Sequence, residues 1–331
     1  MGTPVMLMAR VIEMARDNQE TRDKRLDEIL RRQLGVQILA MIEDPSITDI
    51  LVNDDGQVWY EARGGLCDAQ FSLPSSQVES IIGTAAASLG TVANAEHPIV
   101  EGELSIGRIR FEGLLPPVAR KPCFVLRLPA HVLYTLANYE NDEIITAEQA
   151  RVFRDAIQQK RNIAIGGGTG SGKTTLGGAV INEMVLLSAP ATRFVIIEDT
   201  LEIQCKARNL VQLHTSEHAD MTRLVRATMR LRPDHIIVGE VRGGEALALL
   251  KAWGTGHPGG VTTVHANSAA TILTRLSTLV QEAGVPPQPE MIAETINLLV
   301  FIERRPEGRR VTEMLRVDGF DHNKGFLTSA I

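Results

Sequence analysis

The sequence predicts an α/β protein of two domains, a smaller N-terminal α+β domain followed by a larger α/β domain with a mainly parallel sheet. Its 331 residues are 44% hydrophobic with a mean hydropathy near zero, which is enough apolar material for two cores. In the second half, continuous apolar runs alternate with segments of helical pattern, as in a sheet covered on both faces. We expect the first domain over residues 1–137, a linker over 138–148 and the second domain over 149–331.

Near its beginning the chain has a segment, residues 5–34, in which apolar residues at helical spacing are mixed with charges of both signs. This pattern predicts an amphipathic helix. We expect the helix to pack on its own domain. Docking on a membrane surface or a partner is the alternative, and the mixed charges favour it less because they form no single cationic face.

The rest of the first domain consists of short β-branched runs and one helical pattern. The runs 47–52 and 57–61 are joined by Asn-Asp-Asp-Gly, which predicts a β-hairpin. A helix is expected over 76–89, with strands over 106–111 and 124–128. In the second domain the apolar strands are expected over 162–165, 193–197, 235–238 and 260–264.

A glycine-rich loop follows the first of these apolar strands. Its residues fit the spacing G-x-x-x-x-G-K-[ST], in which glycines turn backbone N–H groups toward phosphate and the following helix adds its positive end. Lys173 is expected to reach the β- and γ-phosphates of ATP, and the Thr174 hydroxyl to hold Mg²⁺. The predicted nucleotide-binding residues of the loop are Gly167, Gly168, Thr169, Gly170, Ser171, Gly172, Lys173, Thr174 and Thr175.

Acidic residues follow two later strands, at the sheet edge where open α/β folds bind their ligands. Glu198 and Asp199 end one apolar run, and Glu240 ends another, followed two residues later by Arg242. Most such strands of P-loop proteins end in Asp-Glu, whereas Gly239 takes the first place here. We expect Glu198 and Glu240 to position water, Asp199 and Glu240 to hold Mg²⁺ with Thr174, and Arg242 to sense the γ-phosphate. Which of the two glutamates orients the water stays open.

Two histidines flank a glycine turn and the last predicted strand of this group. His257 and His265 could suggest a metal site, but no cysteine or third histidine lies nearby in the sequence. Neutral imidazole donors near the γ-phosphate are the better interpretation, so we predict that both histidines act in catalysis.

The overall composition narrows the function classes. The formal net charge of −6 argues against a generally basic nucleic-acid-binding surface but leaves a local basic patch open. Three cysteines without C-x-x-C spacing favour neither a disulfide framework nor zinc, and they are typical of a reducing cytoplasm. No secretory leader or apolar run of membrane-spanning length is present in the sequence, so we expect any membrane link to be peripheral or through partners.

The order of these motifs resembles that of the type II and type IV secretion ATPases, a family that includes pilus retraction motors. The Gly239-Glu240 pair is shared with that family. Within it, the short N-terminal domain and the run Gly-His-Pro-Gly-Gly at 256–260 look most like the conjugal transfer ATPases of the TrbB type.

The resemblance implies a RecA-like ATPase domain, hydrolysis of ATP with Mg²⁺, and a homohexamer that powers pilus assembly or substrate transfer. It implies partners among the inner-membrane components of a secretion or conjugation machine, a place at the cytoplasmic face of the inner membrane, and peripheral membrane association. Direct contact with DNA is left open. Arginines of the N-terminal domain, at positions matching Arg110 and Arg127, are implied to reach the phosphates. A second group of arginines precedes the strand that ends in Glu240, and consists of Arg223, Arg226, Arg230 and Arg232. It is either an ordinary charged helix face or part of a subunit boundary.

Two other classes fit the loop less well. A ring helicase or DNA translocase needs a basic, aromatic-bearing pore, and aromatic residues make up only 4% of the chain. A small-molecule kinase needs an acceptor site and lid after the loop, which the paired histidines and the dedicated first domain do not favour.

Overall fold

The computed structural model describes residues 4–62, 65–129, 134–216 and 218–331, with side chains from Thr21 onward. The chain divides into two compact units, residues 1–132 and 133–331. No helix among the described residues is long and apolar enough to cross a membrane.

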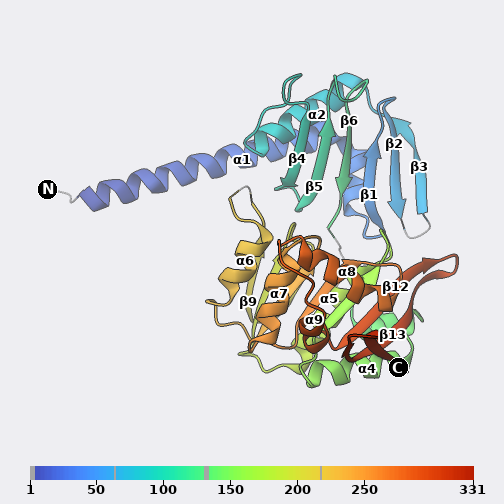
Figure 1. Cartoon of the computed structure of the whole chain (residues 1–331). Helices are drawn as coiled ribbons and strands as arrows, with labels where there is room; N and C mark the ends of the chain where they lie inside the picture. Colours follow the sequence, from blue (N-terminus) through green and yellow to red (C-terminus); the bar gives the residue numbers. More distant parts are fainter. Residues whose placement is uncertain (1–3, 63–64, 130–133, 217) are drawn as a thin grey trace. The chain divides into compact units, whose positions relative to one another are not determined.

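The first unit is a six-stranded antiparallel sheet packed against two helices, with strand order β3-β2-β1-β6-β5-β4 (Figure 1). Its strands alternate buried and exposed residues, as expected for a sheet with one covered face. Leu34 of the first helix and Ile82 of the second pack in this core with Phe124 of the sheet. The elements are α1 (Pro4–Glu43), β1 (Ile47–Val52), β2 (Gln57–Ala62), β3 (Gly65–Ser72), α2 (Ser75–Ser88), β4 (Ile99–Leu104), β5 (Ile109–Leu114) and β6 (Cys123–Arg127).

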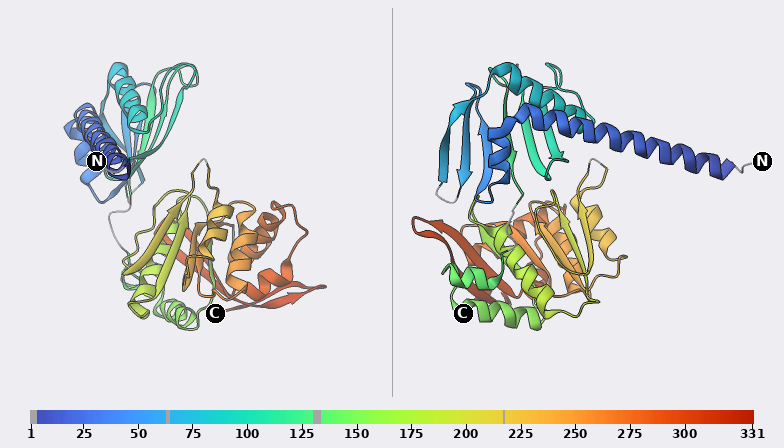
Figure 2. Two further views of the ribbon diagram at one scale, coloured as in Figure 1. Left: turned by 90° about the vertical axis from the view of Figure 1, so that its left-hand side faces the viewer. Right: turned by 180° about the vertical axis from the view of Figure 1, so that it is seen from behind.

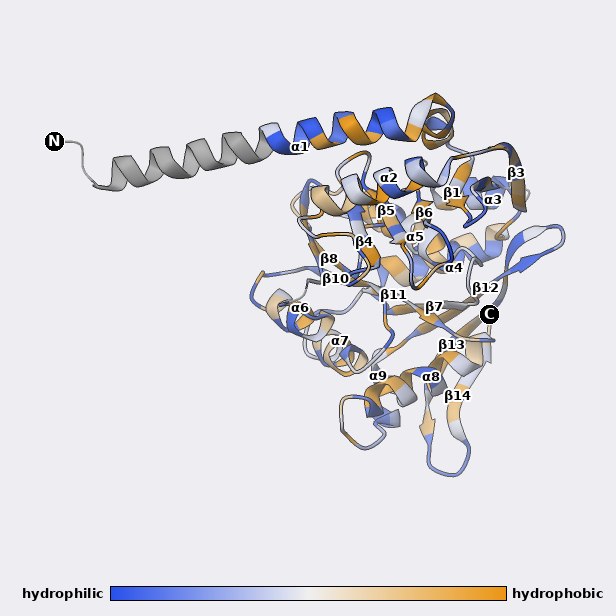
Figure 3. Ribbon diagram, turned by 90° about the horizontal axis from the view of Figure 1, so that it is seen from above, coloured by the Kyte–Doolittle hydropathy of each residue, from blue (hydrophilic) through white to orange (hydrophobic). Residues whose placement is uncertain are grey.

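The predicted amphipathic helix is longer than expected and bends at Gly35, whose φ of 76° is not helical. Where its side chains are described, hydrophobic and hydrophilic residues alternate along it (Figure 3). Leu30 and Leu34 of the predicted segment are buried against their own unit, as is Ile38 beyond it, while the side chains of residues 5–20 lie outside the described part. The predicted hairpin is confirmed, since Val52 and Val58 are paired across the turn. Strands β3 and β4 were not expected.

The second unit has three layers, an eight-stranded sheet with helices on both faces (Figures 1 and 2). Strand order is β14-β13-β12-β7-β11-β10-β8-β9, in which the six strands from β12 to β9 are parallel. Helices α3, α4 and α5 cover one face, and α6 to α9 cover the other. The buried strands are continuous apolar runs because both faces are covered.

The helices of the second unit are α3 (Leu136–Asn141), α4 (Ala147–Gln158), α5 (Lys173–Leu187), α6 (Met221–Thr228), α7 (Glu245–Gly254), α8 (Ala269–Gln281) and α9 (Pro289–Thr295). The strands are β7 (Ile163–Gly167), β8 (Arg193–Glu198), β9 (Asn209–His214), β10 (His235–Glu240), β11 (Val261–His265), β12 (Leu298–Arg305), β13 (Gly308–Asp321) and β14 (Gly325–Ala330).

The stretch 138–148, expected as a linker, lies within the second unit. It contains part of α3 and the start of α4, and Tyr139 and Ile145 are buried in the core beneath α5. Thr146 caps α4 through a reciprocal pair of hydrogen bonds with Gln149.

Candidate active site

The glycine-rich loop joins β7 to α5, at the carboxyl edge of the parallel sheet. Two of its glycines leave no room for a side chain. A Cβ on Gly167 would lie 2.3 Å from the carbonyl oxygen of Ile302, and one on Gly172 would lie 2.8 Å from Cδ of Arg309. Gly172 also has a φ of 94° at the N-cap of α5, in the left-handed region that favours glycine. The loop therefore has the strand, turn and helix geometry of a phosphate-binding loop.

Lys173 begins α5, and its side chain lies across this loop. Its Nζ donates to the carbonyl oxygen of Gly168 at 2.9 Å and lies 3.5 Å from Nδ1 of His265. Burial lowers the pKa of the Lys173 ammonium, and the Glu240 carboxylate acts in the opposite direction. The Lys173 side chain is only 7% exposed, and its ammonium lies close to two other predicted site residues, Gly168 and His265.

Strand register brings the predicted site residues to one edge. In the parallel pairs, His265 lies opposite Gly167, and Glu240 lies opposite Thr263. Glu198 ends β8, which pairs with β10 in the same direction. Three separate strands therefore present their last residues beside the glycine-rich loop, as expected for a ligand site of an open α/β sheet.

Glu240 is the centre of an ion-pair cluster at this edge. Its Oε2 accepts from Nε and Nη2 of Arg242 at 2.9 and 2.5 Å, and its Oε1 lies 3.1 Å from Nε2 of His265. Arg242 also donates from Nη1 to Asp199 at 3.1 Å. Glu245 accepts from the backbone N–H groups of Arg242 and Gly243, which holds the turn after β10.

Glu198 has a different environment from Glu240. It is only 3% exposed, and its Oε1 accepts from the backbone N–H groups of Glu202 and Ile203 at 3.0 and 2.9 Å. A Cβ on Gly239 would lie 3.0 Å from Cγ of Glu198, closer than nearly all real contacts. Glycine at 239, where most P-loop proteins have Asp, therefore makes room for the buried Glu198 side chain.

The surroundings of His265 favour its neutral form. Burial lowers its pKa, the Lys173 ammonium lowers it further, and the Glu240 carboxylate opposes both. The lowered pKa favours the neutral imidazole over the charged form. It can then donate one hydrogen bond and accept another at the edge of the site.

The structure does not bring His257 into this cluster. His257 precedes β11 by four residues, whereas His265 ends that strand. A strand of five residues is about 16 Å long, so the two histidines lie at opposite edges of the sheet. His235 rather than His257 contacts the glycine turn, with Nδ1 2.7 Å from the carbonyl oxygen of Gly259.

The two predicted arginines of the first unit are brought side by side. Arg110 on β5 and Arg127 on β6 are direct partners in the antiparallel register. Arg127 also lies 3.6 Å from Oδ1 of Asp49. An acid lies opposite each arginine on the neighbouring strand, Glu103 of β4 opposite Arg110 and Asp49 of β1 opposite Arg127.

One residue at the loop was missed from the sequence. Arg309, at the start of β13, has its Nε 3.4 Å from the carbonyl oxygen of Gly170, and its aliphatic stem lies over Gly172. It reaches the loop from 139 residues away in the sequence. A run of arginines near residue 309 is the only sequence signal, and it does not distinguish this residue from its neighbours.

The oxygen donors predicted for Mg²⁺ are chemically suitable. Thr174 lies in the first turn of α5, and the carboxylates of Asp199 and Glu240 are joined by Arg242. Among the described residues no group of three or more His, Cys, Asp or Glu side chains could hold a metal ion.

Residues 33–305 match the family described as Type II/IV secretion system protein. The chain belongs to this family. It is 48% identical over 299 residues to conjugal transfer protein TrbB of Rhizobium radiobacter, covering 90% of this chain and 92% of that one. It is 31% identical over 313 residues to type IV secretion system protein PtlH of Bordetella pertussis, covering 82% and 91%. The predicted similarity to secretion ATPases of the TrbB type is confirmed.

Solved structures confirm the fold. The Legionella pneumophila ATPase DotB superposes with a TM-score of 0.63 at 24% identity, covering 86% of this chain and 80% of that one. The pilus retraction motor PilT with bound ADP superposes with a TM-score of 0.59 at 18% identity, covering 89% and 81%. The predicted fold, a P-loop domain with a smaller N-terminal domain, is thus confirmed.

Proposed function

We propose that this protein is a homohexameric motor that hydrolyses Mg²⁺-bound ATP to power conjugative transfer or pilus assembly. It works at the cytoplasmic face of the inner membrane, in peripheral association with the membrane components of a type IV secretion machine. The relative named conjugal transfer protein TrbB, matched over nine-tenths of both chains, supports this role. The observation that carries the catalytic part is the cluster in which Lys173, Glu240 and His265 meet beside the glycine-rich loop.

The loop supplies the phosphate contacts of the proposed reaction. Its backbone N–H groups and the Lys173 ammonium hold the β- and γ-phosphates and balance the charge that develops during transfer. Ser171 supports this assignment, because its buried hydroxyl has no hydrogen-bond partner among the described residues and can donate to a phosphate oxygen. Mg²⁺, when bound, neutralises phosphate charge, with Thr174 and Asp199 as the residues that would hold it.

Glu240 is the residue we assign to the attacking water. Water attacks the γ-phosphorus in line, the bond to the β–γ bridging oxygen breaks, and the products are ADP and phosphate. Glu240 accepts a hydrogen bond from this water and takes its proton. Arg242 can remain anchored on Asp199 while Glu240 turns toward the water, since it bonds both acids. Glu198 holds the turn after β8 through its backbone contacts and acts as a positioning residue.

His265 and Arg242 are the residues that respond to the γ-phosphate. Arg242 donates hydrogen bonds to Oε2 of Glu240, and Nε2 of His265 lies 3.1 Å from Oε1, so a phosphate oxygen that attracts either residue changes the surroundings of the catalytic acid. His257 has no place in this mechanism within one subunit, because it lies at the opposite edge of the sheet.

Arg110 and Arg127 are proposed as further phosphate-binding residues. Their direct cross-strand pairing is the supporting observation, because a planar guanidinium pair is suited to bidentate contacts with phosphate oxygens. Replacing either by Ala should weaken ATP binding without unfolding the first unit. Unchanged nucleotide affinity in both variants would remove them from the site.

The proposed function is tested by a phosphate-release assay combined with light scattering during size-exclusion chromatography. We expect turnover of ATP without an acceptor substrate, and a six-subunit particle in the presence of a non-hydrolysable ATP analogue. A monomer with full ATPase activity would refute the ring. Strong stimulation by single-stranded DNA would instead favour a nucleic-acid translocase.

A further inference from the structure

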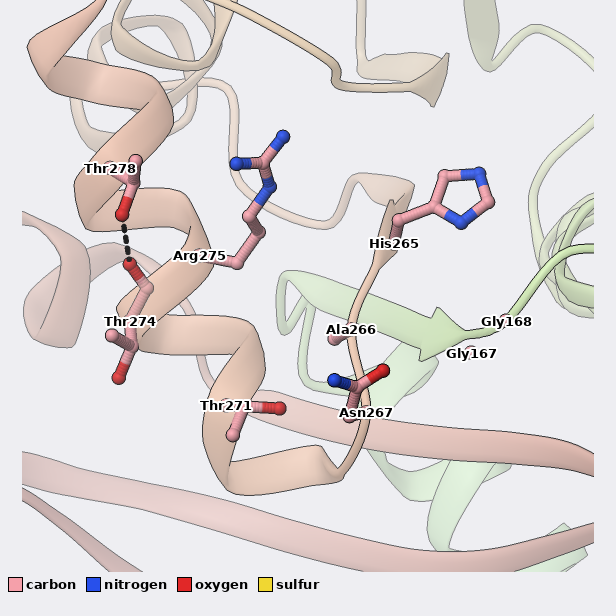
Figure 4. Close-up of a pocket in the computed structure, with 9 residues that line it drawn as sticks. All are labelled: Gly167, Gly168, His265, Ala266, Asn267, Thr271, Thr274, Arg275 and Thr278. Atoms are coloured by element: carbon pink, nitrogen blue, oxygen red, sulfur yellow. Dashed lines mark hydrogen bonds between the residues drawn. The ribbon is translucent and has the colours of Figure 1, made fainter.

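A pocket lies beside the glycine-rich loop, between the loop and α8 (Figure 4). Its volume is about 340 Å³, and it opens on the first two glycines of the loop, Gly167 and Gly168. Its other lining residues come from the end of β11, from the turn that follows and from α8, and are His265, Ala266, Asn267, Thr271, Thr274, Arg275 and Thr278. None of the motifs recognised in the sequence assigns a role to its α8 side.

Arg275 carries the only permanent charge among these lining residues. Its side chain is half-buried, and it forms no hydrogen bond or ion pair with any residue that the structure describes. It extends from α8 toward the side on which the His265 imidazole stands (Figure 4). Arg275 is also one of the positive charges that lower the pKa of His265. A partly desolvated guanidinium without an acid is unfavourable, so the pocket is suited to an anion.

Neutral donors complete the pocket. Asn267 and Thr274 form no side-chain hydrogen bond with the described residues. Thr271 and Thr278, in contrast, donate to the backbone carbonyls of Ser268 and Thr274 within α8. The residues that line the pocket therefore include an amide, a hydroxyl and a guanidinium side chain.

We propose that this pocket is a phosphate subsite, in which Arg275 binds a tetrahedral phosphate group next to the glycine-rich loop. The group is either the γ-phosphoryl group of bound ATP or the inorganic phosphate formed by hydrolysis. The inference rests on the proposed ATPase reaction and extends it by naming a ligand of the phosphate on α8. Phosphate is favoured over other anions because the pocket opens directly on Gly167 and Gly168, and a guanidinium forms paired hydrogen bonds with phosphate oxygens.

The test uses the full chain with Arg275→Gln, Arg275→Lys and the control Arg316→Gln. Arg316 pairs with Asp318 and lies opposite Leu298, at the sheet edge away from the loop. Affinity is measured by calorimetry for ADP, for a non-hydrolysable ATP analogue and for inorganic phosphate in the presence of ADP. Phosphate release is followed with a fluorescent phosphate sensor, and thermal unfolding shows whether each variant is folded.

The two sources of phosphate give different results. If the pocket holds the γ-phosphoryl group, Arg275→Gln weakens binding of the ATP analogue about tenfold and leaves ADP binding unchanged, because one charge-assisted contact is lost. If it holds the released product, nucleotide affinities are unchanged, while phosphate binding beside ADP weakens about tenfold and its release becomes faster. Arg275→Lys restores part of either effect.

Equal affinities of wild type and Arg275→Gln for all three ligands would overturn the proposal. An equal loss of ADP and ATP-analogue binding would also overturn it. Arg275 would then contact a part of the nucleotide that ADP and ATP share, or would stabilise the fold. If Arg275→Gln does not fold, the same comparison is made with Arg275→Lys and Thr274→Val. Failure of the ATPase proposal itself is separate, because it appears as normal turnover after loss of Lys173.

Discussion

Replacing Glu240 by Gln separates the roles of charge and shape in the central cluster. Gln keeps the size of the side chain and its capacity for hydrogen bonds, but it cannot take a proton from water. A positioned general base contributes about 10² to 10⁴ in rate, or about 3 to 5 kcal/mol of transition-state stabilisation. We therefore expect turnover to fall at least a hundredfold while ATP still binds.

The same substitution should change stability much less. The Arg242 side chain is 58% exposed, and it keeps its contact with Asp199 when Glu240 is neutralised. Ion pairs with an exposed partner contribute about 1 kcal/mol or less. The loss of transition-state stabilisation should thus exceed the loss of unfolding free energy several-fold. A purely structural role of Glu240 would not produce this difference.

The chain offers a matched control for this experiment. Glu303 pairs with Arg305 two residues later at 2.7 Å, the same spacing as in the Glu240 pair, but in an exposed hairpin. Glu303→Gln should leave turnover, ATP affinity and melting temperature close to wild type. Phosphate release under saturating ATP and calorimetry with a non-hydrolysable analogue are the measurements. Equal losses of binding and turnover in Glu240→Gln would refute a role as base. Glu240 would then be a metal ligand or a structural residue.

Three further predictions concern the loop and the core. Lys173→Ala should reduce turnover on the order of a hundredfold or more, because the loop loses the cation that holds the phosphates. The melting temperature should not fall, because removing a buried cation has no desolvation cost. Wild-type turnover would contradict the loop assignment. Gly172→Ala should cost about 1 to 3 kcal/mol in stability and weaken nucleotide binding, since its φ is 94° and its Cβ would meet Arg309, whereas Gly178→Ala in the open part of α5 should not. His235 is buried, and burial lowers its pKa, so the native state favours neutral imidazole. The free energy of unfolding should be at its full value above about pH 6.5 and fall below it by up to about 1.4 kcal/mol per pH unit. Chemical unfolding as a function of pH measures this slope, and a variant His235→Asn with an unchanged slope would contradict it.

The parts of the site that follow directly from strands could be predicted from sequence. An apolar run that ends in Gly-rich or acidic residues places those residues at the carboxyl edge of a parallel sheet, which is why Lys173, Glu240 and His265 were found together. The hairpin before Val58 was predicted for a similar local reason, from turn residues between two apolar runs. In each case the information lies within about ten neighbouring residues.

Contacts between distant segments could not be predicted in this way. The apolar face of α3 and the burial of Tyr139 depend on packing against α5, so the stretch around them lacked the periodicity of an independent element and was expected to be a linker. Arg275 was passed over because one arginine on an amphipathic helix is usually a solvated surface charge. The structure changes this interpretation, because Arg275 forms no ion pair with any acid among the described residues.

Strand direction explains both the misplaced histidine and the missed arginine. For a parallel strand, the residue after the strand reaches the ligand edge and the residue before it does not, so His265 lies at the site and His257 lies at the far edge. β13 is antiparallel to β12, and its first residues therefore lie at the ligand edge, which places Arg309 over the glycine-rich loop. Once the direction of a strand in this sheet is known, the end that lies at the ligand edge follows from it.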